Sequence, residues 1–189
     1  MSKPTAVIVL CEDNRTFSFT RSYLRRCGIL SGVRPVISQR GSAFTFVVNN
    51  FPIQVNAYRL ARARMQTWLI AIVDADTSTI AQRIGEMDRG LTQSQEPRVR
   101  AMRIQDEAIA RLIPRRNIET WILALNSTAI NETDDFKGTI KTDEKWSELI
   151  PTVSQAFYTL TRPNANIPED LIELLRHGIG EMRRVELAR

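Results

Sequence analysis

The sequence has little of what several common kinds of site require. Its two cysteines, Cys11 and Cys27, cannot build a disulfide framework, they show no zinc-type spacing, and His177 is the only histidine. No apolar run approaches the roughly 20 residues of a membrane span. The first residues lack signal-peptide organisation, and no GxxxxGK[ST] nucleotide-binding loop occurs. We therefore expect a cytoplasmic protein with reduced thiols, no membrane association and no nucleotide-binding loop of its own.

Lysine is also scarce, so arginine supplies most of the positive charge. Lysine occurs only at positions 3, 137, 141 and 145, whereas Lys and Arg together number 26 and the net charge is +5. This balance favours an acidic partner, and the guanidinium fork matches phosphate geometry, although arginine richness can equally reflect genomic base composition. We expect a surface that tracks a nucleic-acid backbone, built from clustered arginines: Arg59, Arg62, Arg64, Arg98, Arg100, Arg103, Arg111, Arg115 and Arg116.

Apolar patterning predicts an α/β fold. Continuous apolar runs at 5–10, 68–73 and 109–113 are typical of strands buried on both faces, and 34–38 and 43–49 are further predicted strands. Helical spacing predicts helices over 16–27, 52–65, 78–90, 115–125, 144–160 and 168–187, the last interrupted by Gly178 and Gly180. Such alternation indicates a mostly parallel central sheet flanked by helices. We expect a catalytic core over 1–126, and over 127–189 a loop with a C-terminal helical extension packed on it.

Acidic residues follow two of the predicted strands. Glu12 follows the first strand, and Asp74 and Asp76 follow the strand that ends in DAD. If these strands are neighbours, the three carboxylates meet at the carboxyl edge of the sheet and need a cation to offset their repulsion. Oxygen ligands of this kind suit Mg²⁺ or Mn²⁺. The plainer alternative for Asp76 is capping the helix that follows, and for Asp13 a solvated turn.

These motifs resemble the TOPRIM domain of topoisomerases, primases and overcoming-lysogenization-defect-type nucleases. In that family a glutamate ends the first strand, as in VIVLCED, and a D-x-D ends a later one, as in DAD. The segment IPRRNIETWIL resembles a part of small stand-alone TOPRIM nucleases and adds Glu119. The resemblance covers roughly residues 5 to 126. It departs where Asp13 replaces the family's glycine, which argues against the topoisomerase and primase branches.

The resemblance implies metal-dependent hydrolysis of phosphodiester bonds. It makes Glu12 a general base or metal ligand, Asp74 and Asp76 metal ligands, and Glu119 a fourth catalytic carboxylate. Arg115 and Arg116 are candidate phosphate-binding residues, and Lys137, Lys141 or Lys145 is a candidate for the lysine that such nucleases place near the phosphate. It also implies nucleic acid as the partner, DNA rather than RNA, and anti-phage defence beside a separate ABC-type ATPase. A homo-oligomer stays open.

Two other functions remain compatible with the residues. A TOPRIM-like subunit that binds nucleic acid or an ATPase without turnover would keep the same carboxylates. A phosphatase of the haloacid-dehalogenase type would use Asp74 as its nucleophile, although such enzymes carry D-x-D on their first strand, and here a strand and a helix precede it. The lone His177 lies in a predicted terminal helix, and we expect no catalytic role for it.

Overall fold

The structure, a computed structural model, describes residues 5–39, 43–99, 104–128, 130 and 134–187. Within this part, four strands form one sheet in the order β2-β1-β3-β4. They are β1 (Ala6–Cys11), β2 (Val33–Ile37), β3 (Thr67–Ile72) and β4 (Ile109–Leu112), and every pairing is parallel. The predicted fold class, an α/β core with a mostly parallel central sheet flanked by helices and a C-terminal helix, is confirmed, and the core is Rossmann-like.

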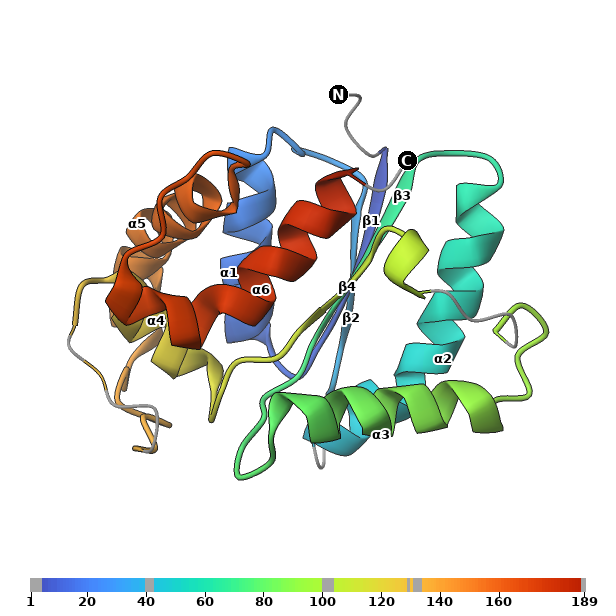
Figure 1. Cartoon of the computed structure of the whole chain (residues 1–189), viewed down its shortest axis with the longest axis horizontal. Helices are drawn as coiled ribbons and strands as arrows, with labels where there is room; N and C mark the ends of the chain where they lie inside the picture. Colours follow the sequence, from blue (N-terminus) through green and yellow to red (C-terminus); the bar gives the residue numbers. More distant parts are fainter. Residues whose placement is uncertain (1–4, 40–42, 100–103, 129, 131–133, 188–189) are drawn as a thin grey trace.

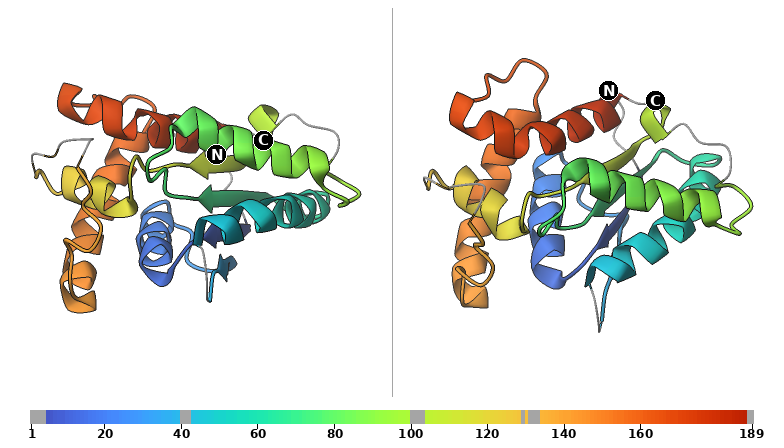
Figure 2. Two further views of the ribbon diagram at one scale, coloured as in Figure 1. Left: turned by 90° about the horizontal axis from the view of Figure 1, so that it is seen from below. Right: turned by 60° about the horizontal axis from the view of Figure 1, so that its bottom comes forward.

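Helices cover both faces of the sheet, which explains why its strands are apolar runs (Figures 1 and 2). On one face α2 (Ala43–Arg62) packs on β1 and β3, and α3 (Ile80–Gln93) packs on α2. On the other, α1 (Asn14–Arg26) packs on β1 and β2, and α6 (Glu169–Leu187) packs on β4. Helix α5 (Asp143–Thr161) lies outside α1, and α4 (Ile118–Leu125) contacts α5 and α6. A short 3-10 turn (Ile104–Asp106) precedes β4.

The strand predicted over residues 43–49 is wrong. Residues 43–49 are not a strand, because α2 begins at Ala43 and runs through Pro52. The buried side chains Val47, Phe51, Val55 and Tyr58 recur every three or four residues, which is the helical period, although β-branched and aromatic residues favour a strand locally. The helix ends at Arg62 rather than at Met65, which is 47% exposed.

Helix α6 is continuous, although two glycines were expected to interrupt it. Gly178 faces the ring of Trp121, and a Cβ at position 178 would lie only 2.2 Å from Cη2 of that ring. The glycine therefore permits close packing of α6 on α4 rather than a break.

No helix within the described ranges is long and apolar enough to cross a membrane. The division at residue 126 stays a prediction.

The two edge strands are protected in different ways. In β2, Pro35 pairs with Val9. Because the Val7 N–H donates to the Gly32 carbonyl, the backbone nitrogen of residue 35 points away from β1, towards the open edge. Proline has no N–H to offer there, so it discourages the addition of another strand. The outer edge of β4 is instead covered by side chains of α6: His177, Glu181 and Arg184.

Candidate active site

The parallel topology brings Glu12 and Asp74 together. Strands β1 and β3 are neighbours, with Leu10 paired to Ala71, so the chain leaves both strands at the same edge of the sheet. Glu12 follows β1 directly, and its Oε1 accepts a hydrogen bond from the backbone N–H of Asp74 at 3.0 Å. The predicted meeting of carboxylates from two strand ends therefore begins with a direct contact between these residues.

The segment that carries both aspartates is fixed to the connection after β4 by backbone hydrogen bonds. The N–H of Ala75 donates to the carbonyl of Pro114, and that of Asp76 donates to the carbonyl of Arg116, each at 2.9 Å. Asp76 and Arg116 both have positive φ, 50° and 67°, which lets the two connections turn beside each other. This pairing sets DAD against PRRNIE, segments about forty residues apart in the sequence.

Glu119 joins the acidic site from the first turn of α4. Asn117 caps this helix, since its side chain accepts a hydrogen bond from the N–H of Thr120 at 3.2 Å. A carboxylate in the first turn is favoured by the helix dipole, yet Glu119 is only 8% exposed. Its negative charge acts on Asp74. All four predicted catalytic carboxylates, Glu12, Asp74, Asp76 and Glu119, thus lie at one edge of the sheet.

Ionisation of this cluster is opposed by its surroundings. Burial and the negative charges of Glu12, Glu119 and Asp76 hold the pKa of Asp74 well above its usual value. Burial, and the charges of Asp76 and Asp13, also raise the pKa of Glu12, against the hydrogen bond from Asp74. Carboxylates under mutual repulsion at low exposure are the environment in which a bound cation has most to offset.

The side chains fit a hard cation by chemistry more closely than by geometry. Their donors are carboxylate oxygens, as Mg²⁺ and Mn²⁺ prefer. Across the described ranges, however, no three His, Cys, Asp or Glu side chains are arranged to hold a metal ion. Glu12, Asp74 and Asp76 are the residues able to supply carboxylate ligands. Asp76 is held elsewhere, by Arg83 at 3.5 Å.

Arg83 is a component of the site that the sequence did not reveal. It lies in the second turn of α3, is 7% exposed, and donates to the carbonyls of Asp74 and Ala75 at 3.2 Å each. The capping box of Thr79 and Gln82 starts the helix that carries it. In the sequence, Arg83 is one arginine among many in an amphipathic helix. The one hint of its burial is that it lies a helical turn before Met87, on the apolar face.

Asp13, for which the sequence offered a solvated turn as the plainer alternative, has a structural role at the start of a helix. Its side chain accepts a hydrogen bond from the N–H of Thr16 at 2.7 Å and caps α1. Asp76 does not cap α3, because Thr79 does. The capping alternative for Asp76 is therefore wrong.

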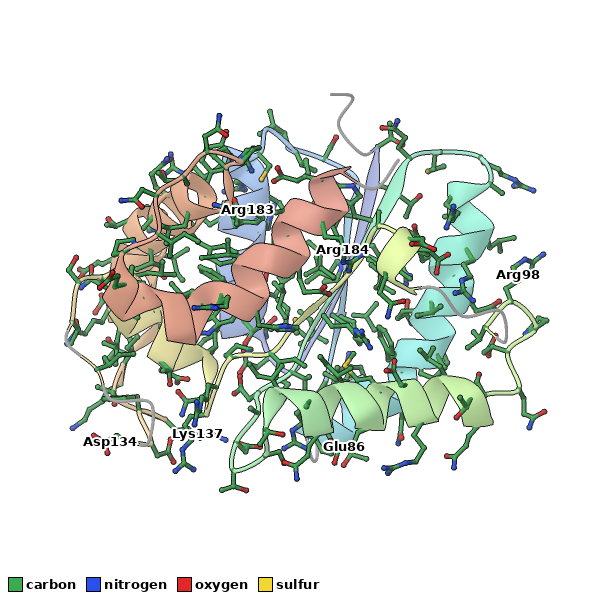
Figure 3. The ribbon with its side chains drawn as sticks, in the orientation of Figure 1. Glu86, Arg98, Asp134, Lys137, Arg183 and Arg184 are labelled. Carbon is green, nitrogen blue, oxygen red and sulfur yellow. The ribbon has the colours of Figure 1, made fainter. Side chains whose placement is uncertain are left out.

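One of the three candidate lysines lies beside the acidic site. The carboxylate of Asp135 accepts from the Asn117 side chain at 2.7 Å and from the backbone N–H of Lys137 at 2.9 Å. The Lys137 charge consequently acts on Glu12, where it favours ionisation. Figure 3 shows Lys137 at the lower edge of the molecule, next to the connection from β4 to α4. Among the three lysines, Lys137 is the one the structure associates with a predicted catalytic residue.

Arg115 and Arg116, the predicted phosphate-binding residues, line a cleft next to Asp76. The cleft has a volume of about 450 Å³, and its other wall is residues 76–81, which lead into α3. Its lining combines hydroxyl side chains and guanidinium groups with one carboxylate at the acidic site. A phosphate group that enters this cleft would meet hydrogen-bond donors of the kind it prefers.

Several other arginines expected on a nucleic-acid surface are engaged within the protein. Arg59 and Arg62 both bind Glu107, at 2.7 and 2.6 Å, and Arg111 is only 8% exposed and binds Asp88 at 2.7 Å. Arg59 and Arg111 thus add little to an open basic surface, whereas the Arg62 side chain is 44% exposed. Arg100 and Arg103 lie outside the described residues.

The chain was compared with family models, curated proteins and solved structures, and none of them matches it. The geometry at the carboxyl edge of the sheet is therefore what supports a function.

Proposed function

We propose that this protein is a metal-dependent nuclease that hydrolyses phosphodiester bonds of nucleic acid. The observation that carries the proposal is the convergence of Glu12, Asp74, Asp76 and Glu119 at the carboxyl ends of adjacent parallel strands, with raised pKa values at Glu12 and Asp74. Clustered carboxylates whose ionisation is opposed need a partner of positive charge, and Mg²⁺ or Mn²⁺ suits them.

Each residue has a separate task in this proposal. Glu12, Asp74 and Asp76 hold the cation, and Glu119 extends the acidic set towards α4. A divalent cation bound there would polarise the phosphate and lower the pKa of bound water. Lys137 approaches from the Glu12 side and, like the arginines of the 450 Å³ cleft, Arg115 and Arg116, would bind phosphate oxygens of the substrate.

The resemblance to TOPRIM nucleases extends the proposal to biology. It favours DNA over RNA as substrate and a role in anti-phage defence in the cytoplasm, beside a separate ABC-type ATPase. The described residues contain no contact that bears on this partner, so the ATPase is proposed on the resemblance alone.

A nuclease assay with matched variants tests the proposal. Purified protein is incubated with plasmid DNA, single-stranded DNA and RNA in Mg²⁺, Mn²⁺ or EDTA, beside Glu12→Ala, Asp74→Ala and the exposed control Glu148→Ala. We expect cation-dependent cleavage that falls by at least about 100-fold in the first two variants, because each removes a proposed ligand, and persists in the control. Equal cleavage by all four proteins would assign the activity to a contaminant or another site.

The same samples separate the alternatives. Binding of Mn²⁺ and nucleic acid without cleavage would indicate the non-catalytic subunit. Trapping of a phosphoaspartate at Asp74 with a phosphomonoester substrate would indicate the phosphatase. Absence of Mn²⁺ uptake in calorimetry would contradict both the nuclease and any metal-dependent relative of it.

A further inference from the structure

Arg83 occupies a fixed position beside the acidic site. Its guanidinium lies over the ring of Phe44, 3.7 Å from the centroid, and only 8% of its side chain is exposed. Nε and Nη2 donate to the carbonyls of Asp74 and Ala75 at 3.2 Å, and Nη1 donates to Glu86 at 3.0 Å. These contacts hold the guanidinium without any help from Asp76.

Asp76 is the weakest of the attachments of Arg83. Its Oδ2 lies 3.5 Å from Nη2, beyond the other contacts, and its side chain is 48% exposed. An ion pair of this length and exposure has a small free energy. Asp76 can therefore leave the guanidinium while Arg83 remains bound to the backbone, to Glu86 and to the face of Phe44.

We propose that Arg83 is the internal counter-ion of the acidic site and sets its affinity for divalent cations. In the cation-free protein Arg83 holds Asp76, and cation binding transfers the Asp76 carboxylate from the guanidinium to the cation. This inference rests on the proposed function and deepens it. It accounts for the absence, among the described residues, of a ready three-carboxylate arrangement, since one proposed ligand is engaged elsewhere.

Two effects of Arg83 act in the same direction. Its positive charge repels an arriving cation, and its ion pair competes for one ligand, so both lower cation affinity. Glu86 opposes both effects, because it shares the guanidinium at 3.0 Å and offsets part of its charge. Figure 3 shows Glu86 on α3 near this edge of the molecule. Removing the charge of Glu86 should therefore strengthen the hold of Arg83 on Asp76.

Calorimetric titration of the cation-free protein with MnCl₂ tests the inference without any activity measurement. Arg83→Gln keeps an N–H donor for the carbonyls but removes the charge, and we expect it to bind Mn²⁺ about three- to tenfold more tightly. Arg83→Lys keeps the charge and should stay within about twofold of the wild type. Glu86→Gln should bind Mn²⁺ more weakly. Arg89→Gln, an exposed arginine of the same helix, is the control for charge at a distance and should change little.

A double-mutant cycle shows whether the effect passes through Asp76. In an Asp76→Asn background, which lacks the contested ligand, Arg83→Gln should change the Mn²⁺ affinity less than in the wild type. Equal or weaker binding by folded Arg83→Gln, with a far-ultraviolet spectrum like that of the wild type, would overturn the inference and leave the nuclease proposal standing. If that variant does not fold, Glu86→Gln decides: unchanged or tighter binding overturns the inference. A wild-type protein that takes up no Mn²⁺ defeats the proposed function itself, and this inference with it.

Discussion

Helix α6 closes the outer edge of β4, and loss of Arg184 should cost the fold several hydrogen bonds at once. Figure 3 shows Arg184 on α6 above this strand. Its guanidinium donates to the carbonyls of Gln105 at 3.1 Å and Glu107 at 2.7 Å, and also to that of Ile109. Glu181 accepts from the N–H of Arg111 at 2.9 Å. Side chains of α6 thus form hydrogen bonds with backbone groups of β4 that a further strand would otherwise pair with.

The expected loss of unfolding free energy depends on which of these hydrogen bonds water can replace. The bond to Gln105 is exposed, so water substitutes for Arg184 there, whereas those to Glu107 and Ile109 are partly buried. Leaving two such carbonyls without a donor costs about 1 to 1.5 kcal/mol each, so Arg184→Met should lose about 2 to 3 kcal/mol of unfolding free energy. At about 2 to 4 °C per kcal/mol for a chain of this size, Tm should fall by about 4 to 12 °C.

Urea unfolding followed by far-ultraviolet circular dichroism measures this loss. Arg184→Met keeps the length and apolar stem of the side chain, and Arg89→Met makes the same replacement at an exposed position of α3. We expect a lower midpoint for Arg184→Met and an unchanged one for Arg89→Met. A loss below about 0.5 kcal/mol for Arg184→Met, comparable to an ordinary surface substitution, would refute the edge-capping argument.

Three further predictions concern groups with shifted pKa values. Burial and neighbouring charge raise the folded-state pKa of Asp74, so the free energy of unfolding falls as the pH rises from 3.8 through that pKa. Asp74→Asn should therefore raise the urea midpoint at pH 7 in EDTA. Calorimetry should show that the same variant no longer binds Mn²⁺. Burial lowers the pKa of His177 in the folded protein below 6.5. Its contribution to stability is therefore complete above pH 6.5 and is lost as the pH falls through the folded-state pKa. His177→Gln should flatten the decline in urea midpoint just below pH 6.5. Burial raises the pKa of Cys11 to about 12, so a thiol reagent at pH 8 should label Cys27 in the native protein and Cys11 only after unfolding, as mass spectrometry of peptides would show.

Sequence patterns predicted the strands β1, β3 and β4 and the carboxylates that follow two of them. The strands β1, β3 and β4 are short apolar runs because helices cover both faces, and such runs are visible in the sequence. Parallel strands end at a common edge, so Glu12 and Asp74 were expected to meet once β1 and β3 were neighbours. That adjacency itself was an assumption, since nothing in the sequence fixes the order of strands.

Interactions between distant segments were beyond sequence reasoning. The face of α2 that packs on the sheet shows its helical period only once Val47, Phe51 and Val55 are known to be buried together. Arg83 looks like any surface arginine until its carbonyl partners are in place. What distinguishes Lys137 from Lys141 and Lys145 is the hydrogen bond from Asn117 to Asp135, which holds the segment of Lys137 near the acidic site. Hydrogen bonds between distant segments have no local signature in the sequence.

The contrast between the acidic site and the rest of the fold is the strongest physical argument for function. Elsewhere, carboxylates of low exposure bind arginines: Glu107 binds Arg59 and Arg62, and Glu181 binds Arg184. These contacts help to lower the pKa of Glu181, despite its burial. At Asp74, burial and the charges of Glu12, Glu119 and Asp76 move the pKa upward, although Arg83 lies beside its backbone carbonyl. The fold pairs Glu107 and Glu181 with guanidinium groups but gathers further carboxylates around Asp74, an arrangement that a bound cation would stabilise.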